Sequence, residues 1–175
     1  MKDLASYVHE IPDFPKKGVL FRDITGILDD VEALRFSVDE LMRRLDGVEF
    51  DVLAAMESRG FIFGMPLAYL LGKPFLPVRK PGKLPRATIA ESYELEYGES
   101  RLEIHTNLLH EGCRVVVVDD LLATGGTAAA CAHLIARAGA KVVKMLFIME
   151  LAAFGARKGK LDGIDVDALI TYPEA

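Results

Sequence analysis

Two adjacent carboxylates follow a run of four valines, and a loop of small and hydroxylated residues comes directly after them. The segment reads VVVVDDLLATGGT and covers 115–127. Asp119 and Asp120 are acceptors that suit hydroxyls or a metal ion, and they would repel a phosphate. The loop offers glycine backbone N–H groups and threonine hydroxyls at the start of a predicted helix, a setting that favours an anion. The segment therefore predicts a ribose 5-phosphate clamp, with the aspartates on the ribose hydroxyls and the phosphate held by Ala123, Thr124, Gly125, Gly126 and Thr127.

An ordinary strand, turn and helix with Asp and Thr as caps is the alternative interpretation. A pair of glycines alone would not exclude it. The combination of apolar strand, acidic pair, small loop and helix is more specific. The other common nucleotide loops, GxxxxGK[ST] and GxGxxG, do not occur in the sequence.

A second anion site is predicted at Ser58, Arg59 and Gly60, which follow an apolar strand and open a helix. The residues alone support a helix cap with a surface arginine equally well. The first phosphate loop, at the end of another strand, favours the anion site.

A basic loop contains Arg79, Lys80, Lys83 and Arg86. Such a run is usually a solvated surface. Because the chain carries a net charge of −5, a concentrated basic loop is expected to attract polyphosphate. A smaller basic cluster at 157–160 is expected to be a solvated loop.

The elements that position these loops follow from hydrophobic periodicity. Continuous apolar strands are predicted at 51–56, 75–79, 115–118, 142–149 and 167–172, and helices at 31–45, 60–71 and 126–138. Alternating strands and helices indicate an α/β fold, with a mostly parallel sheet flanked by helices. The charged stretch 81–105 breaks this rhythm and predicts an antiparallel flap. Ligands bind beyond the carboxyl ends of parallel strands, which is where both anion loops lie.

Composition excludes several classes of protein. The length of 175 residues suits one domain, 1–175. Two cysteines, Cys113 and Cys131, without a CxxC motif favour a reducing, cytoplasmic setting over a disulfide framework. We expect no nucleic-acid partner from the acidic balance, and no membrane span or signal peptide from the hydropathy.

Four segments carry a resemblance to a known family: FPKKGVLFRDIT, ESRGFIFG, RKPGKLPRATIAESYELEYGESRLEIH and VVVVDDLLATGGT. Over 11–151 the chain resembles the type I phosphoribosyltransferases, in particular those that use adenine. The resemblance implies a hood at about 1–30 and a flexible flap at about 81–105. It implies transfer of the 5-phosphoribosyl group from 5-phosphoribosyl 1-pyrophosphate to adenine, giving AMP and pyrophosphate. Open alternatives are another base (xanthine, guanine or orotate) and a non-catalytic regulator that senses the sugar pyrophosphate.

The resemblance also implies a role for each motif. Catalysis is assigned to Glu96 and Tyr97 in the flap, and a cis peptide is expected at Glu57–Ser58. Pyrophosphate binding is assigned to Ser58, Arg59, Gly60, Arg79, Lys80 and Lys83, and adenine binding to Leu20, Phe21, Arg22 and Leu151. Mg²⁺ is expected as cofactor, held mainly by substrate and water without direct protein ligands. A homodimer is expected.

Overall fold

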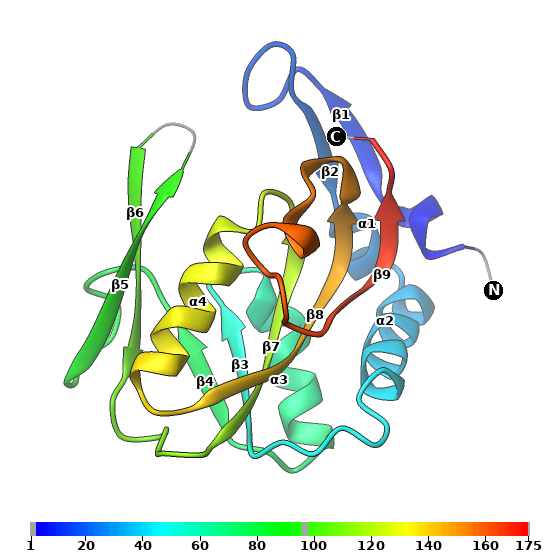
Figure 1. The fold of residues 1–175 in the computed structure, drawn as a ribbon. Coiled ribbons are helices and arrows are strands. Elements are labelled where there is room, and N and C mark those ends of the chain that lie inside the picture. The colour runs from blue at the N-terminus through cyan, green and yellow to red at the C-terminus, as the bar shows by residue number, and fades with distance from the viewer. Residues whose placement is uncertain (1–2, 96–97, 175) are drawn as a thin grey trace.

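A five-stranded parallel sheet forms the centre of the protein, in a computed structural model that describes residues 3–95 and 98–174. Its strand order is β4-β3-β7-β8-β9 (Figure 1). The predicted α/β fold with a mostly parallel sheet is confirmed. The strands are β3 (Val52–Met56), β4 (Phe75–Val78), β7 (Arg114–Leu122), β8 (Lys141–Leu151) and β9 (Val166–Tyr172).

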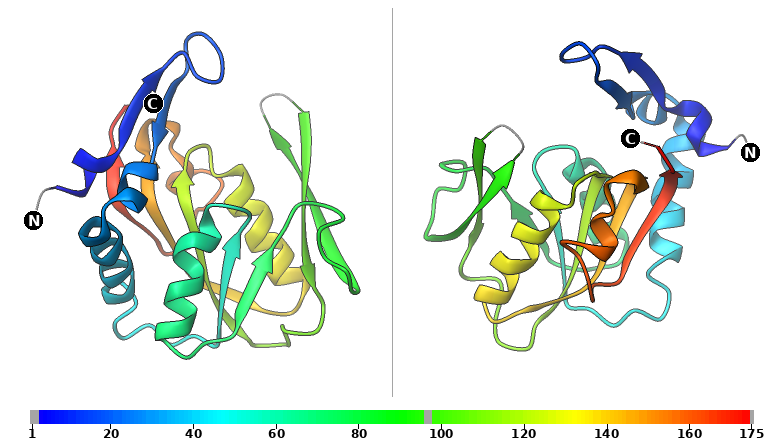
Figure 2. Two further views of the ribbon diagram at one scale, coloured as in Figure 1. Left: turned by 180° about the vertical axis from the view of Figure 1, so that it is seen from behind. Right: turned by 45° about the horizontal axis from the view of Figure 1, so that its top comes forward.

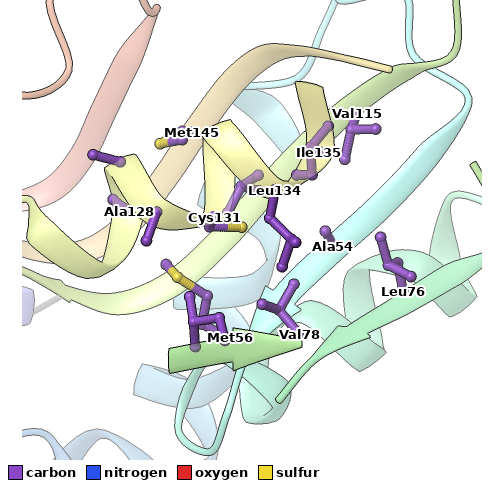
Figure 3. Close-up of a cluster of buried hydrophobic side chains, with 14 of the residues drawn as sticks. Ala54, Met56, Leu76, Val78, Val115, Ala128, Cys131, Leu134, Ile135 and Met145 are labelled. Atoms are coloured by element: carbon purple, nitrogen blue, oxygen red, sulfur yellow. The ribbon is translucent and has the colours of Figure 1, made fainter. Parts of the chain in front are cut away.

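The valines of β7 explain why both faces of this sheet are covered. Side chains alternate along a strand, so Val115 and Val117 enter one hydrophobic cluster while Val116 and Val118 enter the other. Helix α4 (Gly126–Arg137) packs on the first face, where its Leu134 and Ile135 are fully buried (Figure 3). Helices α2 (Val31–Arg43) and α3 (Gly60–Leu70) cover the second face (Figure 2).

Local sequence signals account for where the two helices of the second face begin. Asp30 caps α2, because its Oδ1 accepts hydrogen bonds of 2.9 Å from the backbone N–H groups of Glu32 and Ala33. Helix α3 starts at Gly60, immediately after the loop that leaves β3, and it is apolar on all sides. Such a helix needs burial, which the sheet provides along the side that carries Phe63 and Leu67.

Two small antiparallel sheets flank the parallel one: the first stands at the carboxyl ends of its strands, and the second lies beside α4 and the edge strand β4 (Figures 1 and 2). The N-terminal one pairs β1 (His9–Pro12) with β2 (Leu20–Asp23), between a 3₁₀ turn at Leu4–Tyr7 and the short helix α1 (Thr25–Asp29). The other pairs β5 (Thr88–Leu95) with β6 (Gly98–His105), which confirms that the charged stretch forms an antiparallel hairpin. Short 3₁₀ turns at Ala152–Phe154 and Ala156–Lys158 follow β8.

Two details go beyond the sequence-based expectations. Strand β7 continues to Leu122, beyond the predicted end at 118, because it stays paired with β8 as far as Glu150. The cluster at 157–160 is exposed, as expected of a solvated loop, but Arg157 is also paired, since its Nη2 lies 2.5 Å from the buried carboxylate of Glu150. Among the described residues, no helix is long and apolar enough to cross a membrane.

Candidate active site

The order of the strands determines where a site can form. Strands β3 and β7 are parallel neighbours, yet the helices that follow them, α3 and α4, pack on opposite faces of the sheet. The two loops therefore diverge and leave a crevice at the carboxyl ends. A cavity of about 340 Å³ lies there. Its lining includes Ser58 and Arg59 of one predicted anion loop, the whole of the other, Ala123 to Thr127, and the acidic pair Asp119 and Asp120.

Gly60 brings the two loops into contact. A Cβ atom at this position would lie 2.8 Å from Asp119 Oδ1 and 2.8 Å from the carbonyl oxygen of Val118. Any larger residue would therefore push α3 away from β7. The peptide bond between Glu57 and Ser58 is cis, as the resemblance implied.

The adjacent aspartates are largely withdrawn from water. Asp120 is 4% exposed, and its backbone N–H donates a hydrogen bond of 2.9 Å to Asp119 Oδ1. Burial raises the pKa of Asp119 well above its usual range, and the neighbouring charge of Asp120 adds to the rise. Burial also raises the pKa of Asp120, although the guanidinium of Arg59 opposes this rise.

Arg59 compensates the acidic pair only in part. Its Nε lies 2.7 Å from Asp120 Oδ2, an ion pair that does not meet the geometry of a hydrogen bond. Among the described residues Asp120 Oδ2 accepts no hydrogen bond, although it is buried. A buried acceptor without a donor is suited to a ligand hydroxyl. The guanidinium carbon of Arg59 also lies 5.8 Å from the ring centroid of Phe21.

The predicted phosphate loop has the backbone geometry of an anion site. Gly125 has a φ of 76°, in the left-handed region, and α4 begins at the next residue. The first backbone N–H groups of α4 therefore lie at the wall of the cavity. Thr127 Oγ1 donates a hydrogen bond of 3.4 Å to Tyr93 Oη, so the β5–β6 hairpin contacts this loop.

A second, more apolar cavity of about 430 Å³ adjoins the first. Leu121, Ala123 and Thr124 line both cavities. All the residues assigned to adenine line the second one: Leu20, Phe21, Arg22 and Leu151. Sequence reasoning missed other apolar residues of the lining, among which Met149 lies in β8 and Phe154 in the turn after it, while Val19 precedes β2. Their hydrophobic character was visible, but nothing in the pattern distinguished them from core residues.

The basic loop is divided between the cavity and its rim. Lys80 lines the first cavity. The Nε of Arg79 donates a hydrogen bond of 3.0 Å to Glu57 Oε2, and its Nη1 donates one of 3.1 Å to the carbonyl of Lys83. The bond from Arg79 lowers the pKa of Glu57. Glu96 and Tyr97, assigned to catalysis, lie outside the described residues.

The described residues contain no group of three or more His, Cys, Asp or Glu side chains that could hold a metal by themselves. The acidic pair, in which Asp120 Oδ2 accepts no hydrogen bond, is nevertheless suited to the hydroxyls of a sugar that binds a divalent cation.

The chain matches known proteins along almost its whole length. The phosphoribosyl transferase domain model matches residues 23–167. The adenine phosphoribosyltransferase of Agathobacter rectalis is 52% identical over 172 residues, covering 98% of each chain. The crystal structure of the Thermoanaerobacter pseudethanolicus adenine phosphoribosyltransferase has a TM-score of 0.94 and 52% identity, with 98% of this chain and 99% of that chain covered.

A more distant structure carries ligands. The Saccharomyces cerevisiae adenine phosphoribosyltransferase, in complex with an imino-altritol bisphosphate and adenine, has a TM-score of 0.88 and 38% identity, with 96% of this chain and 97% of that chain covered. Domain model, relatives and solved structures all point to one family. The chain belongs to the phosphoribosyltransferase family, among the adenine phosphoribosyltransferases.

Proposed function

We propose that the protein transfers the 5-phosphoribosyl group from 5-phosphoribosyl 1-pyrophosphate to adenine, giving AMP and pyrophosphate, a step of purine salvage. The observation that carries this proposal is the junction of the two cavities at Leu121, Ala123 and Thr124. A sugar phosphate held in the polar cavity would present its anomeric carbon toward an apolar cavity of a size suited to a purine.

Each cavity has the chemistry of one substrate. The loop from Ala123 to Thr127 would bind the 5′-phosphate, and Ser58, Arg59 and Gly60 would bind the pyrophosphate together with Lys80. Phe21 and Leu151 would enclose the flat base. Backbone groups of Leu20 and Arg22 would read the edge of adenine. Arg79 and Lys83 would reach the pyrophosphate only after Arg79 leaves Glu57.

The bonds exchanged at the anomeric carbon explain the acidic pair. A ring nitrogen of adenine supplies the electron pair for the new bond, while the bond to pyrophosphate breaks and its electrons leave with that group. Positive charge develops on the ribose ring, and the carboxylates of Asp119 and Asp120 would stabilise it from a fixed position. The proton released from adenine is assigned to Glu96, with Tyr97 beside it in the flap.

Mg²⁺ is proposed as cofactor, and when bound it would neutralise the leaving pyrophosphate. Asp119 and Asp120 would act on it through the ribose hydroxyls rather than as direct ligands. Tyr93, Ser100 and Leu102 of the β5–β6 hairpin line the first cavity, so the hairpin would limit the access of water.

We further propose one domain with a hood at about 1–30 and a flap at about 81–105, acting as a cytoplasmic homodimer. Exposed apolar side chains on one face of α3 support the dimer, since Ile62, Met65 and Tyr69 are 37%, 49% and 80% exposed. The buried free thiols of Cys113 and Cys131 fit a reducing compartment.

The test is a base-dependent assay. Adenine, guanine, xanthine, hypoxanthine and orotate are each supplied with 5-phosphoribosyl 1-pyrophosphate, with and without Mg²⁺, and pyrophosphate release is followed. We expect turnover with adenine that depends on Mg²⁺. Turnover with another base would reassign the apolar cavity. The absence of turnover with every base, together with tight binding of the sugar pyrophosphate, would favour a regulator.

A further inference from the structure

The guanidinium of Arg22 is buried, although it belongs to a small two-stranded sheet. Arg22 is 8% exposed, and its Nε and Nη1 are buried without a hydrogen-bond acceptor among the described residues. Glu10, its cross-strand neighbour in β1, places one carboxylate oxygen 3.5 Å from Nε. The guanidinium lies over the ring of Tyr172, with 4.2 Å between its carbon and the ring centroid. A buried charge requires compensation, and the face of the tyrosine ring contributes to it.

Tyr172 occupies a particular place in the central sheet. It is the last residue of β9, and it pairs directly with Leu151 of β8. Leu151 lines the apolar cavity, and so does Phe21, which precedes Arg22 in β2. The contact between Arg22 and Tyr172 therefore joins the strand that carries Phe21 to the strand pair that carries Leu151.

No backbone ladder makes this connection among the described residues. Strands β1 and β2 form a sheet of their own, and they do not pair with the five-stranded sheet. The position of Phe21 relative to Leu151 thus depends on side-chain contacts between the two sheets. A planar guanidinium stacked on a ring has a defined thickness, whereas flexible apolar side chains would allow the sheets to slide.

We propose that Arg22 and Tyr172 are positioning residues, which set the separation of Phe21 and Leu151 and thereby the affinity of the apolar cavity for a flat purine. This inference rests on the proposed function, because it assigns the purine to that cavity. The role belongs to the side chain of Arg22, and it is separate from any contact that its backbone makes with the base.

Paired variants of Tyr172 test the contact. Tyr172→Phe keeps the ring face and should retain the wild-type KM for adenine. Tyr172→Leu removes the ring and should raise the KM for adenine by about 3- to 10-fold, the range expected for the loss of a desolvated cation–π contact. The KM for the sugar pyrophosphate should change by less than about twofold, because the phosphate loops lie on other strands. A similar rise in both KM values would overturn the proposal.

Ligand affinities give a readout that does not require turnover. The ratio of the affinities for AMP and ribose 5-phosphate, measured by calorimetry, reports what the adenine ring contributes. Because it is a ratio, it is insensitive to a fraction of unfolded protein. We expect the ratio to fall about 3- to 10-fold in Tyr172→Leu and in Arg22→Met, and to stay unchanged in Tyr172→Phe.

The outcomes separate this inference from the proposed function. If wild-type protein binds ribose 5-phosphate and AMP equally well, the apolar cavity does not take adenine and the proposed function fails. If wild-type protein prefers AMP and Tyr172→Leu keeps the full preference, the proposed function stands and the positioning role is wrong.

Discussion

The contact between Gly60 and Asp119 leads to the sharpest prediction. In Gly60→Ala the new methyl group would lie 2.8 Å from Asp119 Oδ1 and 2.8 Å from the carbonyl oxygen of Val118. The carbonyl belongs to the buried part of β7 and cannot yield. The start of α3 therefore has to move by a few tenths of an ångström or more, or the carboxylate of Asp119 and the start of α3 move together. Both are proposed to hold the substrate, the start of α3 at the pyrophosphate and Asp119 at the ribose hydroxyls.

The loss of stability in Gly60→Ala follows from overpacking, and the loss of activity follows from displacement of the groups that hold the substrate. Overpacking of this kind typically destabilises by about 1–3 kcal/mol, which lowers the Tm of a chain of this length by about 3–9 °C. A shift approaching 1 Å at a reacting centre reduces the rate by on the order of 100-fold. We therefore expect kcat/KM for the sugar pyrophosphate to fall by about 10- to 100-fold in Gly60→Ala.

Gly64→Ala is the matched control. It lies one turn further along α3, and its Cβ would be 2.6 Å from Ala55 Cβ and 3.2 Å from the ring of Phe75, away from the carboxylates. Its stability should fall by a similar amount. Steady-state kinetics and thermal unfolding of both variants decide the matter. An equal loss of kcat/KM in the two variants would show that overpacking of α3 alone lowers activity, and the reasoning about Asp119 would be refuted.

Three further predictions address the phosphate loop, the acidic pair and the turn after β8. Gly125→Ala forces an alanine into the left-handed region at a φ of 76°, so the affinity for ribose 5-phosphate, measured by calorimetry, should fall about 5- to 30-fold. Replacing Asp119 and Asp120 together by Asn should lower kcat at least about 100-fold, while urea unfolding shows a stability advantage over wild type that grows as the pH rises from about 4. Arg157→Met leaves the carboxylate of Glu150 buried without its partner, and urea unfolding should show a loss of about 1–3 kcal/mol, moderated because Arg157 is 40% exposed.

The sequence could identify the acidic strand and the glycine loop, because these depend on residue types within one short segment. Parallel strands end at one edge of a sheet, so the convergence of the two anion loops was also predictable. The contact between Gly60 and Asp119 was not predictable, because it requires β3 and β7 to be neighbours, and no local pattern specifies that arrangement. The pairing of Arg157 with Glu150 was not predictable either, because the charge run at 157–160 does not specify which segment lies beside it.

The N-terminal sheet of β1 and β2 was the least predictable part of the site. Every residue of β1 is exposed, so the strand has no alternation of polar and apolar positions to detect. Its place depends on β2, and the burial of Arg22 depends on Tyr172, about 150 residues later in the chain. The motif thus identified the residues assigned to adenine, but the contacts that hold them at the cavity involve residues outside the motif.

The buried acidic pair lowers the stability of the fold, and the same burial supports its proposed role in the reaction. Burial raises the pKa of both carboxyl groups above the unfolded values, so the folded protein holds their protons more tightly than the unfolded chain does. The pair destabilises the fold progressively as the pH rises from about 4, the ordinary value, through the raised folded values. Arg59, at 2.7 Å from Asp120, limits this penalty without removing it. In the proposed reaction the same low-dielectric surroundings would strengthen the attraction between the ionised pair and a positively charged ribose ring. In the proposed reaction the sugar would supply the hydroxyl donors and the developing positive charge that suit such a buried pair.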